Sequence, residues 1–264
     1  MKGVHLEGLR VLGNPVDFAN HYYEHGVDEL IYMDVVASLY GRNSLSDLIS
    51  RTARDLLVPL TVGGGLRTQD DIFATLRAGA DKVCINSAAV RNPPFIAEAV
   101  ARFGSSTIVV AIEAIKQRDG QWFAFIENGR ERTGLEVIAW ARQIAALGAG
   151  EILLTSVDRE GTGKGFDADL IRKVSAAVPI PVIAHGGAGN AEHVVEAIQS
   201  SGADAVAAAA LFHYETIRHL QQRVSSEEGN RDFLKSGQKV RSIDPVSIDQ
   251  LKATLINSGI QVRP

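Results

Sequence analysis

Hydrophobic positions along the chain fall into two alternating patterns. Short runs that are almost entirely apolar, such as Ile108–Ile112, alternate with stretches of roughly 10–14 residues whose apolar positions recur at helical spacing. Runs of the first kind are typical of parallel strands buried on both faces. We therefore expect strands at Glu29–Asp34, Leu60–Val62, Lys82–Asn86, Ile108–Glu113, Glu151–Ser156, Val182–Ala184 and Ala205–Ala209. Helices are expected at Val16–Glu24, Leu45–Leu56, Gln69–Ala78, Pro94–Phe103, Leu135–Leu147, Ala168–Ala177, Ala191–Ser200 and about Ile248–Ser258.

Two segments depart from this alternation. The aromatic run Trp122–Ile126, followed by the turn signal Asn128-Gly129, predicts a small β-hairpin inserted in a loop. Residues 1–10 carry no strand pattern. We expect them to form the loop that follows a strand and leads through Pro15 into the first helix.

The chain repeats itself at a spacing of about 122 residues. The run Val58–Leu66 matches Ile180–Ala188, and segments on both sides match at nearly the same spacing. Alternating strands and helices with such a repeat predict an α/β fold, a (βα)8 TIM barrel built from two half-barrels. The counterpart of Ile108–Glu113 would precede Met1, so the first strand is missing from our count. Because a gap leaves two strand edges unpaired, either the chain is N-terminally short or its barrel is closed in some other way, and we favour a shortened chain.

The length of 264 residues, 45% of them hydrophobic, suits one domain with a single core. We take residues 1–264 as one TIM-barrel domain, with a first half at about 1–104 and a second at about 105–264. The second half holds about 30 more residues before its last helix than the repeat requires. This excess lies in a polar stretch at about 215–243. We interpret it as a solvated excursion, with a lid or partner-binding segment as the alternative.

Composition and charge exclude several classes of protein. A net charge of −4 without a long basic run argues against nucleic acid as the main partner. The only cysteine, Cys84, excludes an internal disulfide, and its apolar strand favours a buried hydrophobe over a nucleophile. No apolar run approaches the ~18 residues of a membrane span, so we expect a cytoplasmic protein that does not bind membranes. No spacing indicates a metal site, and no cofactor is expected.

Carboxylates stand where the strands of a parallel barrel present their carboxyl ends, the usual place of the active site. Asp34 and Glu113 end strands in opposite halves, which suits general acid–base catalysis on a substrate that spans the barrel mouth. A helix cap or a salt bridge is the alternative role. For Glu113, which ends a run of apolar residues, we favour catalysis.

Glycine turns follow two strands at corresponding positions of the two halves. Gly64 and Gly65 in one half and Gly186 and Gly187 in the other can present backbone N–H groups to an anion. The neighbouring strand ends would complete two phosphate sites, with Asn86, Ser87, Ala209 and Ala210. Two sites facing each other predict a ligand with a phosphate at each end. The alternative is that the glycines only allow tight turns.

Charged residues begin three of the expected strands, at the opposite end of the barrel. Glu29, Lys82 and Glu151 would be costly there unless they are paired. A salt-bridge ring at the barrel floor is the structural interpretation. A gate or a partner surface is the functional one.

Together these residues closely resemble the cyclase (synthase) subunit of imidazole glycerol phosphate synthase, of histidine biosynthesis. The stretches that carry the resemblance are Leu60–Gly65, Ala80–Val90, Gly148–Ser156 and Gly186–Gly189 with Phe212-His213. The resemblance implies a lyase that combines ammonia with a bis-phosphate substrate, an aminoimidazole carboxamide ribonucleotide with a phosphoribulosyl arm (PRFAR). The products would be imidazole glycerol phosphate and the carboxamide ribonucleotide AICAR.

The resemblance also implies a partner and further site residues. A glutaminase would dock at the barrel floor as the second subunit of a heterodimer and supply the ammonia. Glu29, Lys82 and Glu151 resemble the family's gate for ammonia, and Thr155 and Asp158 fall within the substrate-binding region.

Two departures from the family leave two other functions open: Glu113 stands where the family has an aspartate, which favours the first, and the first strand is missing, which favours the second. One is a paralogous ammonia-using synthase subunit that makes another product, such as an amidino sugar. The other is a non-catalytic barrel that binds a glutaminase.

Overall fold

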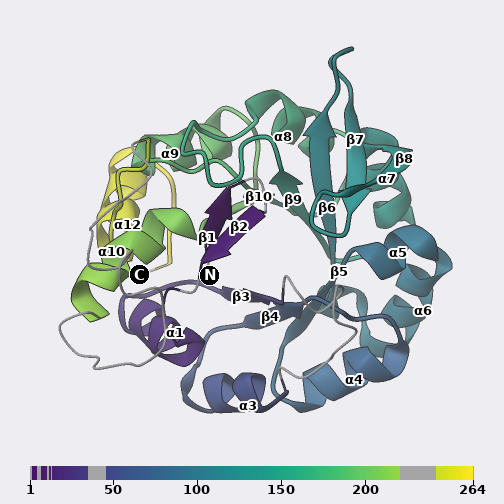
Figure 1. Ribbon diagram of the computed structural model, residues 1–264, viewed down its shortest axis with the longest axis horizontal. Helices are drawn as coiled ribbons and strands as arrows, with labels where there is room; N and C mark the ends of the chain where they lie inside the picture. Colours follow the sequence, from purple (N-terminus) through teal and green to yellow (C-terminus); the bar gives the residue numbers. More distant parts are fainter. Residues whose placement is uncertain are drawn as a thin grey trace.

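The main sheet of the computed structural model is a ring of parallel strands enclosed by helices (Figure 1). The structure describes residues 2–4, 7–10, 12, 14–34, 46–220 and 242–263. Within these ranges, seven parallel strands follow one another in the order β11-β10-β9-β6-β5-β4-β3. Their bounds are β3 Leu30–Met33, β4 Leu60–Gly63, β5 Lys82–Ile85, β6 Ile108–Lys116, β9 Glu151–Ser156, β10 Val182–His185 and β11 Ala205–Ala207.

The internal repeat is visible in individual hydrogen bonds. Leu60 N–H donates to Asp81 Oδ2 at 2.8 Å, and Val182 N–H donates to Asp204 Oδ2 at 2.9 Å in the second half. Each aspartate returns its own N–H to the carbonyl of the same partner. The same contact thus fixes the start of the equivalent strand pair in both halves, as the sequence repeat predicts.

Helices cover the outer face of the sheet and mostly begin with a polar cap. Thr68 and Ser247 each form a capping box, while Asp167 and Asn190 cap the helices that start after them. The bounds are α1 Pro15–Glu24, α3 Ser46–Asp55, α4 Gln69–Arg77, α5 Ser87–Arg91, α6 Pro94–Phe103, α7 Val137–Ala146, α8 Ala168–Ser175, α9 Ala191–Gln199, α10 Ala210–Leu220 and α12 Ile248–Asn257. Helices α5 and α10 were not expected from the sequence, and Leu45, expected to begin a helix, lies outside the described residues.

The core has an outer and an inner part. Apolar residues between the sheet and its helices form the larger cluster, which includes Ile112, Trp140 and Ile152. A separate small cluster fills the space inside the ring of strands: Cys84, Val109, Ala111, Leu153 and Ile183, with Ile31 and Ala207 against it. Adjacent residues on a strand face opposite sides of the sheet, so one strand supplies both clusters.

The two end strands of this sheet, β3 and β11, are not paired with each other in the described part of the chain. The count of seven parallel strands therefore agrees with the prediction. Strand β11 is shorter than the expected Ala205–Ala209, because α10 begins at Ala210. Ala205 is exposed and Met33 of β3 is 39% exposed, in contrast to the buried residues of β4.

The expectation that residues 1–10 form only a loop is wrong. Strands β1 (Lys2–Val4) and β2 (Glu7–Arg10) pair antiparallel in a separate two-stranded sheet, with Lys2 opposite Arg10. Figure 1 shows this ribbon close to β3 and β10 in projection. Two short strands that contain glycine carry little strand propensity, so local sequence gave no signal for them.

The inserted hairpin is confirmed. Strands β7 (Trp122–Ile126) and β8 (Glu131–Glu136) pair antiparallel, and β7 also pairs with the extended end of β6. Figure 1 shows the hairpin projecting from the ring beside β6. Trp122 anchors it, because Trp122 Nε1 donates to Asp167 Oδ2 at 2.8 Å. Of the excursion expected at about 215–243, residues 215–220 belong to α10, and 221–241 lie outside the described residues.

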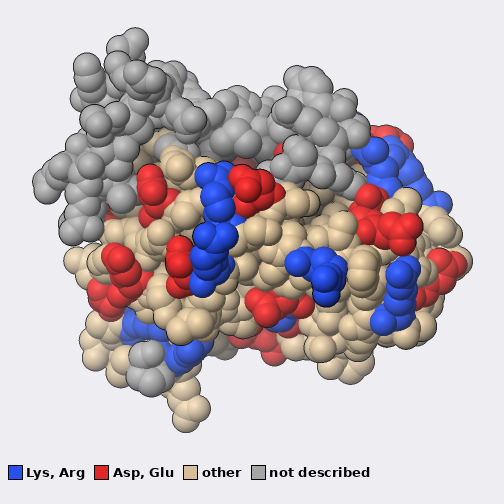
Figure 2. Space-filling model, turned by 90° about the horizontal axis from the view of Figure 1, so that it is seen from below, with Lys and Arg blue, Asp and Glu red and all other residues tan. Residues whose placement is uncertain are grey.

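Surface charge, the cysteine and helix length are described for the same ranges. On the face drawn in Figure 2, the described Lys and Arg side chains are interspersed with Asp and Glu and do not form one basic field. Cys84 is buried and free. Within the described ranges, no helix combines the length and hydrophobicity that a bilayer crossing requires.

Candidate active site at the carboxyl ends of the strands

Parallel pairing brings the expected site residues to one edge of the sheet. Glu113 lies in register with Thr155 of β9, and Thr155 lies in register with His185 of β10. Asp34 and Asn86 follow the last residues of β3 and β5 at the same edge. The carboxyl ends of the strands thus form a polar rim above the apolar inner cluster.

The Glu113 carboxylate is largely buried in this rim. Its pKa rises from 4.5 to about 7, mainly because of burial and to a smaller extent because of the negative charge of Glu127. Two polar groups act in the opposite direction: Gly129 N–H donates to Glu113 Oε2 at 2.7 Å, and the Asn86 amide lies beside the carboxylate. A carboxyl group with a pKa near 7 can both donate and accept a proton at neutral pH.

A buried polar atom without a regular partner accompanies Glu113. Asn86 Nδ2 lies near enough to lower the pKa of Glu113 but forms no hydrogen bond of regular geometry. Ser156 Oγ is also buried and unpaired, but Ser156 lies in register with Ala114 of the outer cluster, so its side chain faces the helices and not Glu113. An unsatisfied donor is costly in an interior, and a polar ligand beside Glu113 would satisfy Asn86 Nδ2.

His185 lies beside Thr155 in the same rim. Thr155 Oγ1 and His185 Nδ1 are 3.0 Å apart, which is a hydrogen bond in either tautomer. Although His185 keeps some exposure, burial of its imidazole lowers the pKa of His185 from 6.5 to about 4. His185 is therefore a neutral imidazole at pH 7 and can donate or accept a hydrogen bond without adding charge.

Close packing of neighbouring loops accounts for the glycine turns. Gly64 has φ +101°, and a Cβ there would lie 2.3 Å from the Asp34 carbonyl oxygen. Gly187 has φ +115°, and its Cβ would lie 2.2 Å from the Gly165 carbonyl oxygen. Gly65 and Gly186 also have positive φ. Packing alone thus requires glycine at both turns, and the phosphate role stays a proposal.

The remaining candidates for phosphate binding lie at helix starts or in loops. Ser87 begins α5, and Ala209 and Ala210 stand at the start of α10. Asp158 is turned toward the end of β6, where its Oδ2 accepts the N–H of Lys116 at 2.8 Å. It lines a groove of about 580 Å³ together with Lys116, Arg159, Lys164, Asp167 and His193.

The three charged residues at the barrel floor form one ion-pair cluster. Lys82 Nζ lies 2.7 Å from Glu151 Oε1 and 3.0 Å from Glu29 Oε2. Burial lowers the pKa of Lys82, but its hydrogen bonds and charge interactions with Glu151 and Glu29 outweigh this and raise it overall. The expected pairing of these residues is confirmed.

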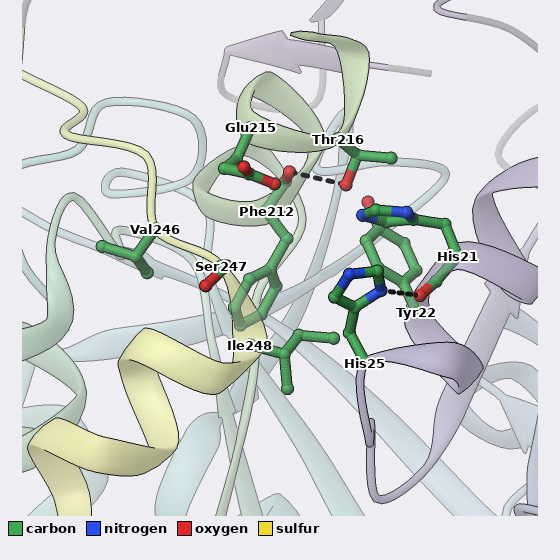
Figure 3. A pocket seen from close by; sticks show the side chains of 9 residues that line it. All are labelled: His21, Tyr22, His25, Phe212, Glu215, Thr216, Val246, Ser247 and Ile248. Carbon is green, nitrogen blue, oxygen red and sulfur yellow. Dashed lines mark hydrogen bonds between the residues drawn. The ribbon is translucent and has the colours of Figure 1, made fainter. Parts of the chain in front are cut away.

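A small cavity in the helix layer does not suit a substrate. It lies between α1, α10 and the start of α12, and its volume of about 10 Å³ is that of one water molecule (Figure 3). His21, Tyr22 and His25 line it from α1. His25 Nδ1 donates to the His21 carbonyl oxygen at 2.7 Å, as the dashed line in Figure 3 shows. Within the described ranges, no three His, Cys, Asp or Glu residues are placed to hold a metal ion.

Sequence reasoning missed two contacts of this site. The Asn128-Gly129 signal predicted the hairpin turn but not that Gly129 N–H reaches Glu113. The pairing of Thr155 with His185 depends on the register of two strands 30 residues apart. The only sequence signal for this contact was that Thr155 and His185 both stand near the carboxyl ends of their strands.

Comparison with known proteins agrees with this arrangement. The chain is 57% identical over 192 residues to imidazole glycerol phosphate synthase subunit HisF of Legionella pneumophila, an alignment that covers 73% of this chain and 91% of that protein. The model of the family described as histidine biosynthesis protein matches residues 1–218. The family match thus covers the first half of the barrel and the second half as far as α10. The chain belongs to the histidine biosynthesis protein family.

Proposed function

We propose that the protein is a cyclase subunit of imidazole glycerol phosphate synthase that converts PRFAR and ammonia to imidazole glycerol phosphate and AICAR. The observation that carries this proposal is the Glu113 carboxyl group, held at the barrel mouth with a pKa of about 7. The 57% identity to a HisF subunit supports the same substrate.

Glu113 acts as a general acid–base group in this proposal. Its carboxylate takes a proton from the ammonia-derived nitrogen, or returns one to the leaving group, as the ring closes. Asp34, at the end of β3, is the second carboxylate at the mouth. His185 stays neutral and orients the substrate by hydrogen bonding.

The two phosphates of the substrate bind at two separate pairs of strand ends. One site comprises Gly64, Gly65, Asn86 and Ser87, and the other Gly186, Gly187, Ala209 and Ala210. Strands β6 and β9 stand between these pairs in the sheet, so the substrate extends across Glu113 and Thr155. Thr155 and Asp158 belong to the same substrate-binding region.

Ammonia reaches this site through the inside of the barrel, from a glutaminase that docks at the floor. Val109 lies in register with Glu151 of the floor cluster and is four residues from Glu113 on β6, a distance of ~13 Å along the strand. The interior between these levels is apolar, with Cys84, Ala111 and Leu153. An apolar passage favours neutral ammonia over ammonium ion, and Glu29, Lys82 and Glu151 form its gate.

The direct test is PRFAR cyclisation with ammonium salt and no glutaminase. We expect turnover by this protein, and a loss of about 10²–10⁴-fold in kcat for Glu113→Gln. Glu192→Gln, an exposed change on α9, is the matched control and should keep full activity. No turnover of PRFAR, with the substrate bound, would favour a paralogous synthase or a non-catalytic barrel.

The partner is tested separately. A glutaminase subunit mixed with this protein should hydrolyse glutamine faster when PRFAR is added, because substrate binding at the mouth is coupled to the floor. Lys82→Met should weaken this response more than it weakens the ammonium-salt reaction. Equal effects of Lys82→Met on both reactions would argue against a gate at the floor.

A further inference from the structure

The turn that touches Glu113 has an unusual backbone. Glu127 and Asn128 have φ values of 54° and 60°, and Gly129 follows with 75°, so three consecutive residues are left-handed. Asparagine and glycine tolerate this region, but glutamate does not favour it. The turn therefore needs contacts from elsewhere in the molecule to keep its shape.

One arginine provides such contacts on both sides of the turn. Arg91 Nη2, at the end of α5, lies 3.0 Å from Glu127 Oε1 and 3.3 Å from Glu131 Oε2. Glu127 precedes Gly129 and Glu131 follows it, so a single guanidinium spans the turn. On its other side Gly129 faces Val157, whose Cγ1 would lie 3.2 Å from a Cβ at that glycine.

The result is a chain of contacts from the surface to the buried carboxylate. The Arg91 side chain is 55% exposed, whereas Glu127 is only 17% exposed, and Gly129 N–H donates to Glu113 Oε2 at 2.7 Å. We propose that Arg91 is a positioning residue: by holding both flanks of the β7–β8 turn, it keeps Gly129 N–H on the Glu113 carboxylate. This role rests on the proposed acid–base function of Glu113, but the contact itself can be tested without catalysis.

Other groups around Glu113 determine the sign of the expected effect. Glu127 approaches from the turn and Cys84 from β5, where the thiol has a raised pKa and carries no charge. Asn86 follows β5, and Thr155, in register on β9, is uncharged. Glu127 is thus the charged group whose effect on Glu113 depends on Arg91.

Loss of the Arg91 charge should therefore raise the pKa of Glu113. In the unaltered protein the Gly129 hydrogen bond lowers the pKa of Glu113, and relaxation of the turn would lengthen and weaken this bond. Glu127 would also lose its counter-ion, so its negative charge would raise the pKa of Glu113 more strongly. For Arg91→Gln we expect an upward shift on the order of half a unit. Displacement of the carboxylate should also lower kcat by roughly 10- to 100-fold with little change in KM.

The pKa of Glu113 can be measured by ¹³C NMR titration of labelled glutamate carboxyls, with Glu113→Gln identifying the signal. Arg91→Lys keeps the positive charge, so the pKa of Glu113 and kcat should both stay close to those of the unaltered protein. Arg102→Gln is the matched control, because Arg102 is a similarly exposed arginine that bonds to Gln69 and lies 3.7 Å from Asp70, away from the site. It should leave the pKa of Glu113 unchanged.

The outcomes separate this proposal from the proposed function. An unchanged pKa of Glu113 in Arg91→Gln, or the same change in Arg102→Gln, overturns the positioning role. A lower melting temperature without a pKa shift means that Arg91 only stabilises the hairpin, which also overturns it. If the pKa shifts as expected but PRFAR is not turned over by the unaltered protein, the contact stands and the assigned reaction fails.

Discussion

Lys82 Nζ lies 2.7 Å from Glu151 Oε1, which joins the starts of two strands that are separated in the sheet by β6. Their side chains are only 16% and 20% exposed. Lys82→Met leaves Glu151 without its partner, and we expect a loss of about 1–3 kcal/mol in the free energy of unfolding. Urea denaturation measures this change.

Two further variants serve as controls for Lys82→Met. Arg172→Gln removes an exposed pair with Asp169 and should cost less than about 1 kcal/mol. Adding Glu151→Gln to Lys82→Met should recover part of the loss, because the unpaired charge is then gone. If the double variant were less stable than Lys82→Met alone, the Lys82–Glu151 ion pair would not account for the loss of stability.

Stability should fall as pH rises through the titration of Glu113. Its pKa rises from 4.5 in the unfolded chain to about 7 in the folded protein, so the folded state binds the proton more tightly. The contribution is complete below pH 4.5 and is lost by about pH 7, at most about 3 kcal/mol. Glu113→Gln should therefore be more stable than the unaltered protein at pH 8 and equal to it at pH 4. Equal denaturation midpoints at pH 8 would disprove the raised pKa.

Gly187→Ala should be far more destabilising than an alanine at another left-handed glycine. At Gly187 the new Cβ would meet the Gly165 carbonyl oxygen at 2.2 Å, whereas at Gly259, with φ +78°, nothing lies within 4 Å. We expect about 1 kcal/mol for Gly259→Ala from backbone strain alone and at least about 3 kcal/mol for Gly187→Ala. Thermal unfolding of the two variants, followed by circular dichroism, tests the difference.

Asp167 has two roles, because it caps α8 and holds Trp122. One oxygen accepts Leu170 N–H at 3.2 Å, and the other accepts Trp122 Nε1 at 2.8 Å. Asp167→Ala should cost about 2–3 kcal/mol, since it removes a cap and leaves a buried indole N–H unpaired. Asn190→Ala removes only the cap of α9 and should cost about 1 kcal/mol. Similar losses for both variants would show that the Trp122 contact is not important.

Cys84 should be unreactive in the folded protein. It is buried inside the ring of strands, where burial and then the charges of Glu113 and Glu151 raise its pKa to about 12. Because the thiolate is the reactive form, a disulfide reagent at pH 8 should modify Cys84 only after denaturant is added. Rapid modification of the native protein would mean that the inner cluster is open to solvent.

Local patterns in the sequence determined much of the architecture. Apolar runs placed the seven parallel strands, and the spacing of about 122 residues identified the two halves that the matching bonds of Asp81 and Asp204 confirm. The hairpin was predictable from Asn128-Gly129. These features depend on residues near one another in the chain, or on the parallel order of strands.

Only the tertiary structure decided which groups meet at the carboxyl ends of the strands. Gly129 reaches Glu113 from 16 positions away and Arg91 reaches Glu127 from 36, because an inserted hairpin folds back over the rim. The raised pKa of Glu113 follows from burial, which no local pattern specifies. The amino-terminal ribbon escaped prediction for a related reason: its strands are too short for periodicity to reveal. Sequence periodicity fixes which face of an element is apolar, whereas contacts between distant loops depend on how the whole barrel packs.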